Sequence, residues 1–392
     1  MRHGRKGVAV GIAMLVLLPA CAGENQAAMG SQGAAEKGGD DRTGEYMPVE
    51  GFWKDHPEAD DGYSYAQIAA VAADTPDRII VGIRGELTPE GEERPNSSNY
   101  LVVVDGSGDV IERWTQWDTL AGFPHTIYIS PYDPERHIWV VDRGGTMRTV
   151  HEQIFKFTND GSELVMRLRD PAPTQAQGGP VARDNPNPGP HDFGQQSTLA
   201  FLPNGDFLVG DGYQNGRVIR FDAQGEFVSE FGSVGSGPGQ FDLVHGVAVD
   251  RDRRIYVVDR RNSRVQVFTE DGEYIEEWPD IFYPSGIYID EHEGVWLWSG
   301  ALNRILKYDT NGVLQYHFGA YGGSSPAGPR GLPSSDFAGG LARPHQMSVD
   351  QEGNVYVASY AGPWVNKFMP KPGADPSRLV GQPLAIDAAV EE

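Results

Sequence analysis

Three histidines recur at one position of a repeated pattern, and imidazole is a common ligand for metal ions. They are His125, His245 and His345. Each lies at the start of an apolar run, and two further copies of the pattern carry Ser197 and Ser285 there. Three imidazoles with an open fourth position form a known catalytic zinc arrangement, which binds a substrate oxygen or activates water. The alternative is that each imidazole simply bonds a neighbouring carbonyl group.

A second set of polar residues follows the next apolar run of several copies. These residues are Arg84, Arg143, Tyr213 and Arg260. The planar fork of arginine matches a carboxylate, so Arg84 or Arg260 is predicted to anchor an acidic substrate. A tyrosine beside a dication and arginines has a lowered phenol pKa, so Tyr213 is the predicted general base. The alternative for the arginines is pairing with local acids such as Asp142 or Asp259.

The three histidines and the second set of polar residues both lie at the ends of short strands in a repeated unit. One copy reads as four apolar runs at 245–250, 254–259, 264–268 and 273–278, separated by turn residues such as Asp271-Gly272. Four strands in about 40 residues are the size of one propeller blade. The pattern therefore predicts one blade for each copy.

The copies number six. The other expected strands are 68–72, 78–84, 101–105 and 110–114 in blade 1; 125–130, 138–142, 153–157 and 163–168 in blade 2; 197–202, 207–211, 217–221 and 226–231 in blade 3; 285–290, 295–299, 304–308 and 313–318 in blade 5; and 345–350, 355–359, 365–368 and 378–379 in blade 6. We predict an all-β, six-bladed β-propeller, which protects its sheet edges by closure. The three histidines then fall on alternate blades, about 120° apart, and converge on the channel that the first strands line.

Two long connections reach the same mouth of the channel. They span 170–193, which is rich in proline, and 320–344, which is rich in glycine. Long loops over a channel mouth are candidate lids, and the alternative is that they are unstructured surface insertions.

The chain begins with a segment typical of export. Basic residues precede an apolar stretch at 8–18 that is too short to span a bilayer. Leu18-Pro19-Ala20-Cys21 then resembles a bacterial lipobox, in which the cysteine is acylated. We expect a protein of the bacterial cell envelope, held to a membrane by the lipid on Cys21 alone. The alternative is an ordinary signal peptide with an incidental cysteine.

The expected domain organisation has four parts. They are a lipoprotein signal peptide at 1–21, a flexible tether at 22–45, the propeller at 46–375 and a polar C-terminal tail at 376–392. The tether is expected because its composition has too few large apolar side chains to form a core.

Composition excludes several classes of function. Cys21 is the only cysteine, so an internal disulfide is impossible and, once it is acylated, so is thiolate or cysteine-ligated metal chemistry. The formal net charge of −23 argues against a nucleic-acid partner, because phosphates would be repelled. We expect a monomer whose partner is a small-molecule or peptide substrate.

Other repeated residues resemble the NHL-repeat consensus. Asp142, Asp211 and Asp259 recur after second strands, and Asn215-Gly216-Arg217 and Asn262-Ser263-Arg264 follow two of them. We expect each aspartate to accept turn N–H groups and each arginine to tie neighbouring blades together.

Over about 65–370 the sequence also resembles the peptidyl-α-hydroxyglycine α-amidating lyase family. The resemblance rests on Phe123-Pro124-His125, on the segments 210–217, 237–245 and 258–264, and on Arg343-Pro344-His345. It implies that His125, His245 and His345 bind a catalytic zinc. It also implies that Tyr213 is the base and that Arg84 and Arg260 contact the substrate. The family cleaves a carbinolamide C–N bond and releases an amide and glyoxylate.

Some positions depart from that family. Its last histidine motif continues with an aspartate that helps to bind a structural calcium, whereas Gln346 stands here, so calcium is doubtful. The family's Asp-Ala-His in the last blade is replaced by Ser359-Tyr360-Ala361. The chain also lacks a companion hydroxylating domain, so the substrate need not be a peptide hydroxyglycine.

The sequence therefore favours a zinc-dependent lyase acting on a hydroxylated, carboxylate-bearing small molecule or peptide. One alternative is a non-catalytic NHL propeller of the cell envelope that binds a protein or glycan. A propeller hydrolase or lactonase is a third possibility. Such enzymes usually hold calcium with Glu, Asn and Asp side chains, and the ring of histidines argues against this reading.

Overall fold

A computed structural model describes residues 43–94, 100–120, 122–144, 152–169, 188–320, 340–362 and 364–386. Cys21, the predicted signal peptide and nearly all of the predicted tether lie outside these ranges. So do most residues of the two predicted lids. Among the described residues, no helix has the length and apolar character needed to cross a membrane.

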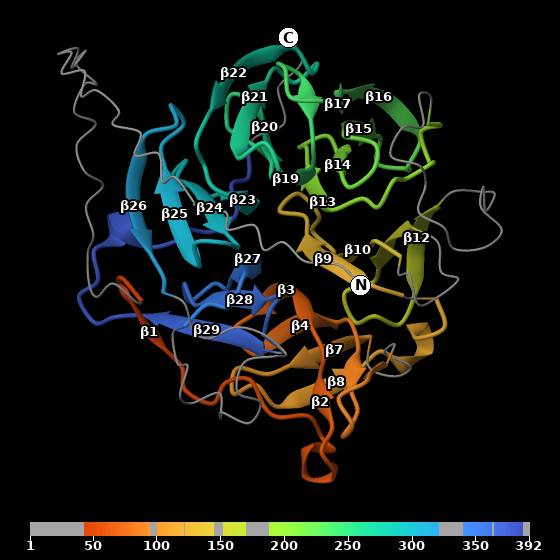
Figure 1. Cartoon of the computed structure of the whole chain (residues 1–392), viewed down its shortest axis with the longest axis vertical. Helices are drawn as coiled ribbons and strands as arrows, with labels where there is room; N and C mark the ends of the chain where they lie inside the picture. The colour runs from red at the N-terminus through yellow and green to blue at the C-terminus, as the bar shows by residue number, and fades with distance from the viewer. Residues whose placement is uncertain are drawn as a thin grey trace, which may run out of the picture. The chain divides into compact units, whose positions relative to one another are not determined.

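In the described part of the chain, six antiparallel four-stranded sheets are arranged in a ring about a common axis, as Figure 1 shows, and they confirm the predicted six-bladed propeller. Blade 1 contains β3 (Ile68–Thr75), β4 (Arg78–Ile83), β7 (Leu101–Val104) and β8 (Val110–Arg113); blade 2 contains β9 (Pro124–Ile129), β10 (Ile138–Asp142), β11 (Gln153–Phe157) and β12 (Leu164–Arg169); blade 3 contains β13 (Thr198–Phe201), β14 (Phe207–Asp211), β15 (Arg217–Phe221) and β16 (Phe227–Phe231). Blade 4 contains β19 (Val244–Val249), β20 (Ile255–Asp259), β21 (Arg264–Phe268) and β22 (Tyr274–Trp278); blade 5 contains β23 (Pro284–Ile289), β24 (Val295–Ser299), β25 (Arg304–Tyr308) and β26 (Leu314–Phe318).

Blade 6 closes the ring with strands from both ends of the described chain. It contains β27 (Pro344–Val349), β28 (Val355–Ser359), β29 (Trp364–Pro370) and, as its outer strand, β1 (Tyr46–Pro48). The prediction of an outer strand at 378–379 is therefore wrong. The 3-10 helix η4 (Pro376–Arg378) occupies that region, and the Asp375 side chain caps it by accepting the Ser377 N–H.

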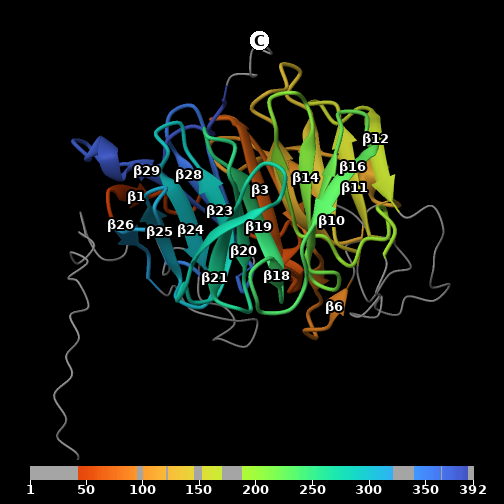
Figure 2. The same cartoon turned by 90° about the horizontal axis from the view of Figure 1, so that it is seen from above.

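Short elements lie outside the blades. They are η1 (Ala59–Asp61), η2 (Thr115–Trp117), a small sheet of β2 (Ser64–Tyr65), β5 (Glu86–Leu87) and β6 (Glu93–Arg94), and the parallel pair β17 (Ser233–Val234) and β18 (Gln240–Phe241). Seen from the side in Figure 2, the blades stand next to one another with their strands along the channel.

The core is a ring of apolar layers between neighbouring blades. Six clusters of buried aliphatic and aromatic side chains each join two adjacent sheets. In the layer between blades 5 and 6, Tyr46 is fully buried and its ring lies 5.4 Å from that of Phe318. Alternation along each strand supplies both faces of a blade with apolar residues, which is why the strands read as nearly continuous apolar runs.

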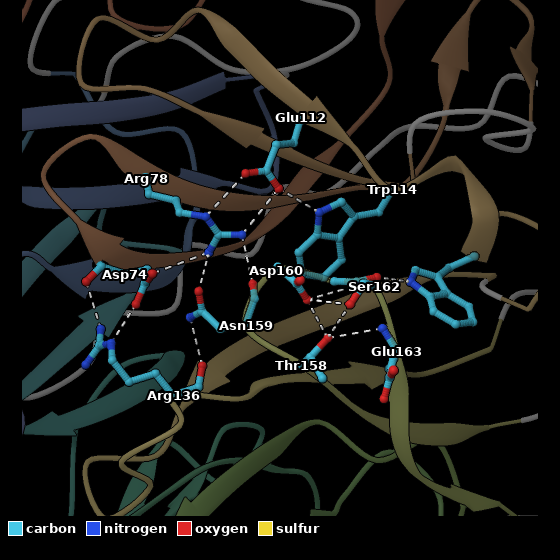
Figure 3. A network of polar contacts seen from close by, with 12 residues as sticks. Asp74, Arg78, Glu112, Trp114, Arg136, Thr158, Asn159, Asp160, Ser162 and Glu163 are labelled. Atoms are coloured by element: carbon cyan, nitrogen blue, oxygen red, sulfur yellow. Dashed lines mark hydrogen bonds and ion pairs between the residues drawn. The ribbon is translucent and has the colours of Figure 1, made fainter.

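Polar contacts add to the packing between blades 1 and 2. Asp74 accepts hydrogen bonds from Arg78 and from Nε of Arg136, at 3.3 and 2.6 Å. Arg78 also donates to Glu112 within blade 1 and to Asn159 in the turn between β11 and β12, and Figure 3 shows this network. A charged cluster therefore spans the outer part of this interface.

The NHL-type arginines bind acids of their own blades and carbonyls of the connections between blades. Arg217 donates to Asp211 at 3.0 Å and to Glu230 at 2.6 Å, and all three belong to blade 3. Arg264 makes the same contacts with Asp259 and Glu277 in blade 4. Nη2 of each arginine also donates to carbonyls of the connection that enters its blade, at Gly189 and Asp192 for Arg217 and at Gly237 and Gln240 for Arg264. The expected tie between neighbouring blades stays a prediction.

The C-terminal segment 379–386 packs across the far end of the channel. Val380 donates its N–H to the Tyr46 hydroxyl, Leu384 donates to the Ile289 carbonyl, and Ile386 donates to the Tyr132 hydroxyl. A cavity of about 360 Å³ lies in the channel beside this segment. The segment was predicted to be a polar tail, yet three of its apolar side chains are buried.

Closure by β1 generates a testable prediction. Replacing Tyr46 by Ala removes a ring that is 0 % exposed and the hydroxyl that accepts the Val380 N–H. We expect Tyr46→Ala to lower the free energy of unfolding by about 3–5 kcal/mol, measured by denaturant titration. Met47, the next residue on the same strand, is 36 % exposed, so Met47→Ala should cost less than about 1 kcal/mol. Equal losses for both variants would contradict the role given to Tyr46.

Candidate metal centre

Each of the three predicted histidines is the extra residue of a β-bulge. In blade 2, Thr126 pairs with Val141 and Pro124 pairs with Asp142, so His125 is left out of the ladder. The pairings of β19 and β27 skip His245 and His345 in the same way. A bulge re-aims a side chain that regular pairing would place elsewhere. Here it turns all three imidazoles toward the channel axis.

The structure brings these imidazoles together. One ligand atom from each of His125, His245 and His345 lies within 4.8 Å of the other two. The ring centroids are 4.6 to 5.2 Å apart. All three side chains are buried. The arrangement is a compact, water-poor cluster of nitrogen donors from alternate blades.

The neighbouring blade fixes the orientation of each imidazole. Each Nδ1 lies within hydrogen-bond distance of a backbone carbonyl, and since a carbonyl oxygen only accepts, Nδ1 carries the proton. The pairs are His125 with Ser197 at 2.7 Å, His245 with Ser285 at 2.8 Å and His345 with Ala69 at 2.9 Å. Each Nε2 consequently holds a lone pair. A carbonyl partner and a metal are therefore compatible, because they use different nitrogens.

The surroundings keep the histidines neutral. Burial lowers the pKa of His125, His245 and His345 well below the usual 6.5. Nearby arginines lower the pKa of all three further, and other imidazoles do so for His125 and His245, because each disfavours an additional positive charge. Neutral imidazole is the form that binds a metal, so no proton has to leave at neutral pH.

Tyr213 faces the same point. Its hydroxyl is 3.1 Å from Nε2 of His125 and 3.0 Å from Nε2 of His245. Tyr213 lies in the turn after β14, and a Cβ at the preceding Gly212 would overlap the Val244 carbonyl. Glycine is required there because the turn approaches β19 so closely. The Gly-Tyr step thus places the phenol over the imidazoles.

The charge around Tyr213 favours its deprotonated form. Burial alone raises the pKa of the phenol, but the positive charges of Arg260, Arg143 and Arg84 outweigh it and lower the pKa below 10. Arg260 also contributes a hydrogen bond from Nη2 to the Tyr213 hydroxyl at 3.4 Å. A buried tyrosine with a lowered pKa is a suitable proton acceptor.

Arg84 and Arg260 reach the same mouth. Arg84 is 4 % exposed and donates from Nε to the Pro124 carbonyl at 2.7 Å, while its Nη2 has no partner among the described residues. Burial is the main cause that lowers the pKa of Arg84 to about 9, and the charge of Arg143 adds to it. The guanidinium of Arg260 stacks between the rings of Tyr213 and Tyr283.

Within the part of the chain that the structure describes, Arg84 and Arg260 form no ion pair with Asp142 or Asp259, which was the alternative given for them. Asp142 instead accepts the backbone N–H groups of Gly122, Phe123 and Gly144, and Asp259 pairs with Arg264. The aspartates are engaged by their own turns and by the NHL-type arginines. Arg84 and Arg260 therefore keep their charge available to a ligand.

Sequence reasoning missed several residues that shape this mouth. Phe123 packs on both Arg84 and Arg143. Tyr283 packs on Arg260. The ring centroid of Tyr360 lies 5.9 Å from that of His345. One signal was available for Tyr360, since it follows the second strand of blade 6 as Tyr213 follows that of blade 3. Tyr283 has φ +48°, an uncommon value for an aromatic residue, and only the structure reveals it.

Gln346 fills the channel beside the histidines and does not fit a calcium site. Its Oε1 accepts the N–H groups of Val71 and Ile127, at 3.1 and 3.0 Å, and its Nε2 donates to the Ile127 carbonyl. The amide joins strands of blades 1, 2 and 6 through ordinary hydrogen bonds. Calcium prefers several carboxylate and carbonyl oxygens as ligands. The Gln346 side chain offers one oxygen, and that oxygen already accepts two hydrogen bonds.

The chain is similar to NHL-repeat proteins and to amidating lyases and monooxygenases. The NHL repeat model matches residues 241–268, which include His245. NHL repeat-containing protein 3 from Homo sapiens is 27 % identical over 327 residues, which cover 81 % of this chain and 82 % of that protein. Peptidyl-alpha-hydroxyglycine alpha-amidating lyase 1 from Drosophila melanogaster is 24 % identical over 319 residues, covering 75 % and 53 %. Peptidylglycine alpha-amidating monooxygenase from Rattus norvegicus is 26 % identical over 263 residues, covering 59 % and 25 %.

The three histidines generate a prediction about metal content. We expect the purified protein, without added metal, to contain about one zinc-like ion per chain by elemental analysis. Replacing His125, His245 and His345 together by Ala should remove it, because no nitrogen donor then remains at the centre. The matched control is His292→Ala, since the His292 side chain is 69 % exposed and does not belong to the cluster of three imidazoles. Less than about a tenth of an equivalent in the wild type, after a check for loss to chelators, would contradict the metal centre.

Gln346 generates a prediction about stability. Gln346→Leu leaves two buried N–H groups and one carbonyl without partners, so the free energy of unfolding should fall by about 2–4 kcal/mol. Gln351→Leu is the control, because the Gln351 residue is exposed and makes one bond to Asp74, and it should cost less than about 1 kcal/mol. Added calcium should not change the unfolding midpoint of the wild type. A rise of several degrees would show that a calcium site exists after all.

Proposed function

From the resemblance of this NHL-repeat propeller to amidating lyases, we propose that the chain is a metal-dependent lyase. Its substrate is a hydroxylated, carboxylate-bearing small molecule or peptide, and the bond that breaks is a C–N bond. The setting that we propose is the bacterial cell envelope, with a lipid anchor at Cys21, and it rests on the first 21 residues of the sequence alone.

One observation carries the proposal. Ligand nitrogens of His125, His245 and His345 lie within 4.8 Å of one another. The Tyr213 hydroxyl lies within hydrogen-bond distance of two of these histidines, 3.1 Å from Nε2 of His125 and 3.0 Å from Nε2 of His245. These residues fit a zinc ion with three imidazole ligands and an open position. When bound, such an ion would act as a Lewis acid on a substrate oxygen.

The surrounding side chains suit the remaining chemistry. Arg84 and Arg260 each have a cationic nitrogen without a partner among the described residues, so either can pair with a substrate carboxylate and hold the substrate in one orientation. Tyr213 then lies beside the substrate hydroxyl and accepts its proton. The C–N electron pair leaves with the nitrogen, which gains a proton, and the hydroxyl-bearing carbon becomes a carbonyl. The products are an amide and an α-oxo acid such as glyoxylate.

The second candidate function is binding without catalysis. NHL repeat-containing protein 3, which is similar to 81 % of this chain, is named only for its repeats. Under this reading the imidazoles only form hydrogen bonds with the carbonyls of neighbouring blades and bind no metal. The protein then binds a protein or glycan of the cell envelope on its surface. Metal content and turnover separate the two candidates.

The role of Tyr213 is testable with an N-acyl-α-hydroxyglycine as substrate and release of glyoxylate as the measurement. Tyr213→Phe keeps the ring and removes the proton acceptor, so kcat should fall by about 10²- to 10⁴-fold. Metal content should stay within error of the wild type. The control is Tyr288→Phe, because the Tyr288 hydroxyl bonds Gly381 in the far part of the channel and should leave turnover unchanged.

Two results would oppose this assignment. A metal-loaded wild type that releases no glyoxylate above the uncatalysed rate would remove the proposed substrate class. A Tyr213→Phe variant that retains full turnover would remove Tyr213 as the base while leaving the lyase proposal intact.

A further inference from the structure

An arc of cationic and phenolic side chains follows the second strands of four consecutive blades. In blade order these are Arg84, Arg143, Tyr213 and Arg260. The guanidinium carbons of Arg143 and Arg260 lie 4.5 and 5.4 Å from the ring centroid of Tyr213. The blades of these arginines are the two neighbours of the Tyr213 blade. Cationic groups therefore approach the phenol from both of its neighbours.

Arg143 and Arg84 belong to one side of this arc. Both guanidinium groups pack on the ring of Phe123, at 4.8 and 4.4 Å from its centroid. On the other side, Arg260 stacks on Tyr283 at 4.9 Å. Aromatic stacking holds arginine in a fixed orientation while leaving the edge of its fork free for an anion. The mouth thus has two separate cationic positions, Arg84 with Arg143 and Arg260 alone.

None of the three guanidinium groups forms an ion pair with a carboxylate of the described residues. Buried nitrogens without a hydrogen-bond partner remain on each of them, namely Nη2 of Arg84, Nε of Arg143 and Nε of Arg260. The adjacent Asp142 is occupied by three backbone N–H groups. Several uncompensated cations in a desolvated mouth are costly, so the arrangement is favourable when anions occupy it.

We infer that Arg143 is a specificity-determining residue and that the substrate carries two carboxylates, one on the Arg84–Arg143 side and one on Arg260. The inference rests on the lyase function proposed above. One carboxylate satisfies one guanidinium fork, so a monocarboxylate leaves cationic nitrogens unpaired on the other side of Tyr213. A dicarboxylate supplies an anion to both sides while its hydroxyl faces the histidines.

A matched pair of ligands tests this inference. Malate and lactate are both 2-hydroxy acids, and malate carries the second carboxylate. By calorimetric titration of the purified protein, malate should bind at least about 10-fold more tightly than lactate. Arg143→Met should remove most of that preference and leave lactate binding within about twofold, because the first carboxylate retains its partner. Arg143→Lys keeps the charge without the fork and should recover only part of the preference.

Control variants distinguish a direct contact between Arg143 and the ligand from a general effect of positive charge near the mouth. Arg261→Met removes an exposed charge next to Arg260 in the sequence and should leave the malate preference unchanged. Equal binding of malate and lactate by the wild type overturns the inference, and so does an equal loss of both ligands in Arg143→Met with an unchanged melting curve. A malate preference that depends on Arg143, in a protein without metal or turnover, would remove the lyase proposal and keep Arg143 as the specificity-determining residue of a dicarboxylate-binding site.

Discussion

The contact between an imidazole and the carbonyl of the next blade is the constraint on which the centre depends. Blades 2, 4 and 6 supply His125, His245 and His345, and blades 3, 5 and 1 supply the carbonyls of Ser197, Ser285 and Ala69. The histidine that donates and the residue whose carbonyl accepts take equivalent positions at the first strands of two successive blades. Each bond fixes one tautomer and one ring orientation, so all three lone pairs point inward without help from a metal. The ring geometry of the propeller, rather than any local motif, thereby prepares the site.

The electrostatics of the mouth contrast with those of the whole chain. The sequence carries a formal net charge of −23, yet the residues around the centre are three arginines, neutral imidazoles and phenols. The arginines remain available because the recurrent aspartates are already engaged, Asp142 by backbone N–H groups and Asp259 by Arg264. A cationic mouth within an acidic protein attracts anions to one place and repels them elsewhere.

Much of this arrangement was predictable from the repeat. The strands Ile138–Asp142 and Val295–Ser299 coincide with their predicted ranges, because alternation and turn residues mark them clearly. Register then placed three histidines on alternate blades. The bulges were not predictable, since an extra residue appears only when two strands are paired. Neither was closure by β1, whose three residues carry little signal, nor the burial of Val380, Leu384 and Ile386 within a segment of polar composition.

Gln346 shows why a neutral amide suits this channel. A dication beside His345 would add two positive charges close to the three imidazoles and to three guanidinium groups. Carboxylate ligands would have to offset that charge, and the residue available at this position is an amide. The amide of Gln346 instead satisfies the N–H groups of Val71 and Ile127 and the carbonyl of Ile127 without adding any charge. It therefore links blades 1, 2 and 6 around the centre and leaves the cationic mouth free to be balanced by a ligand.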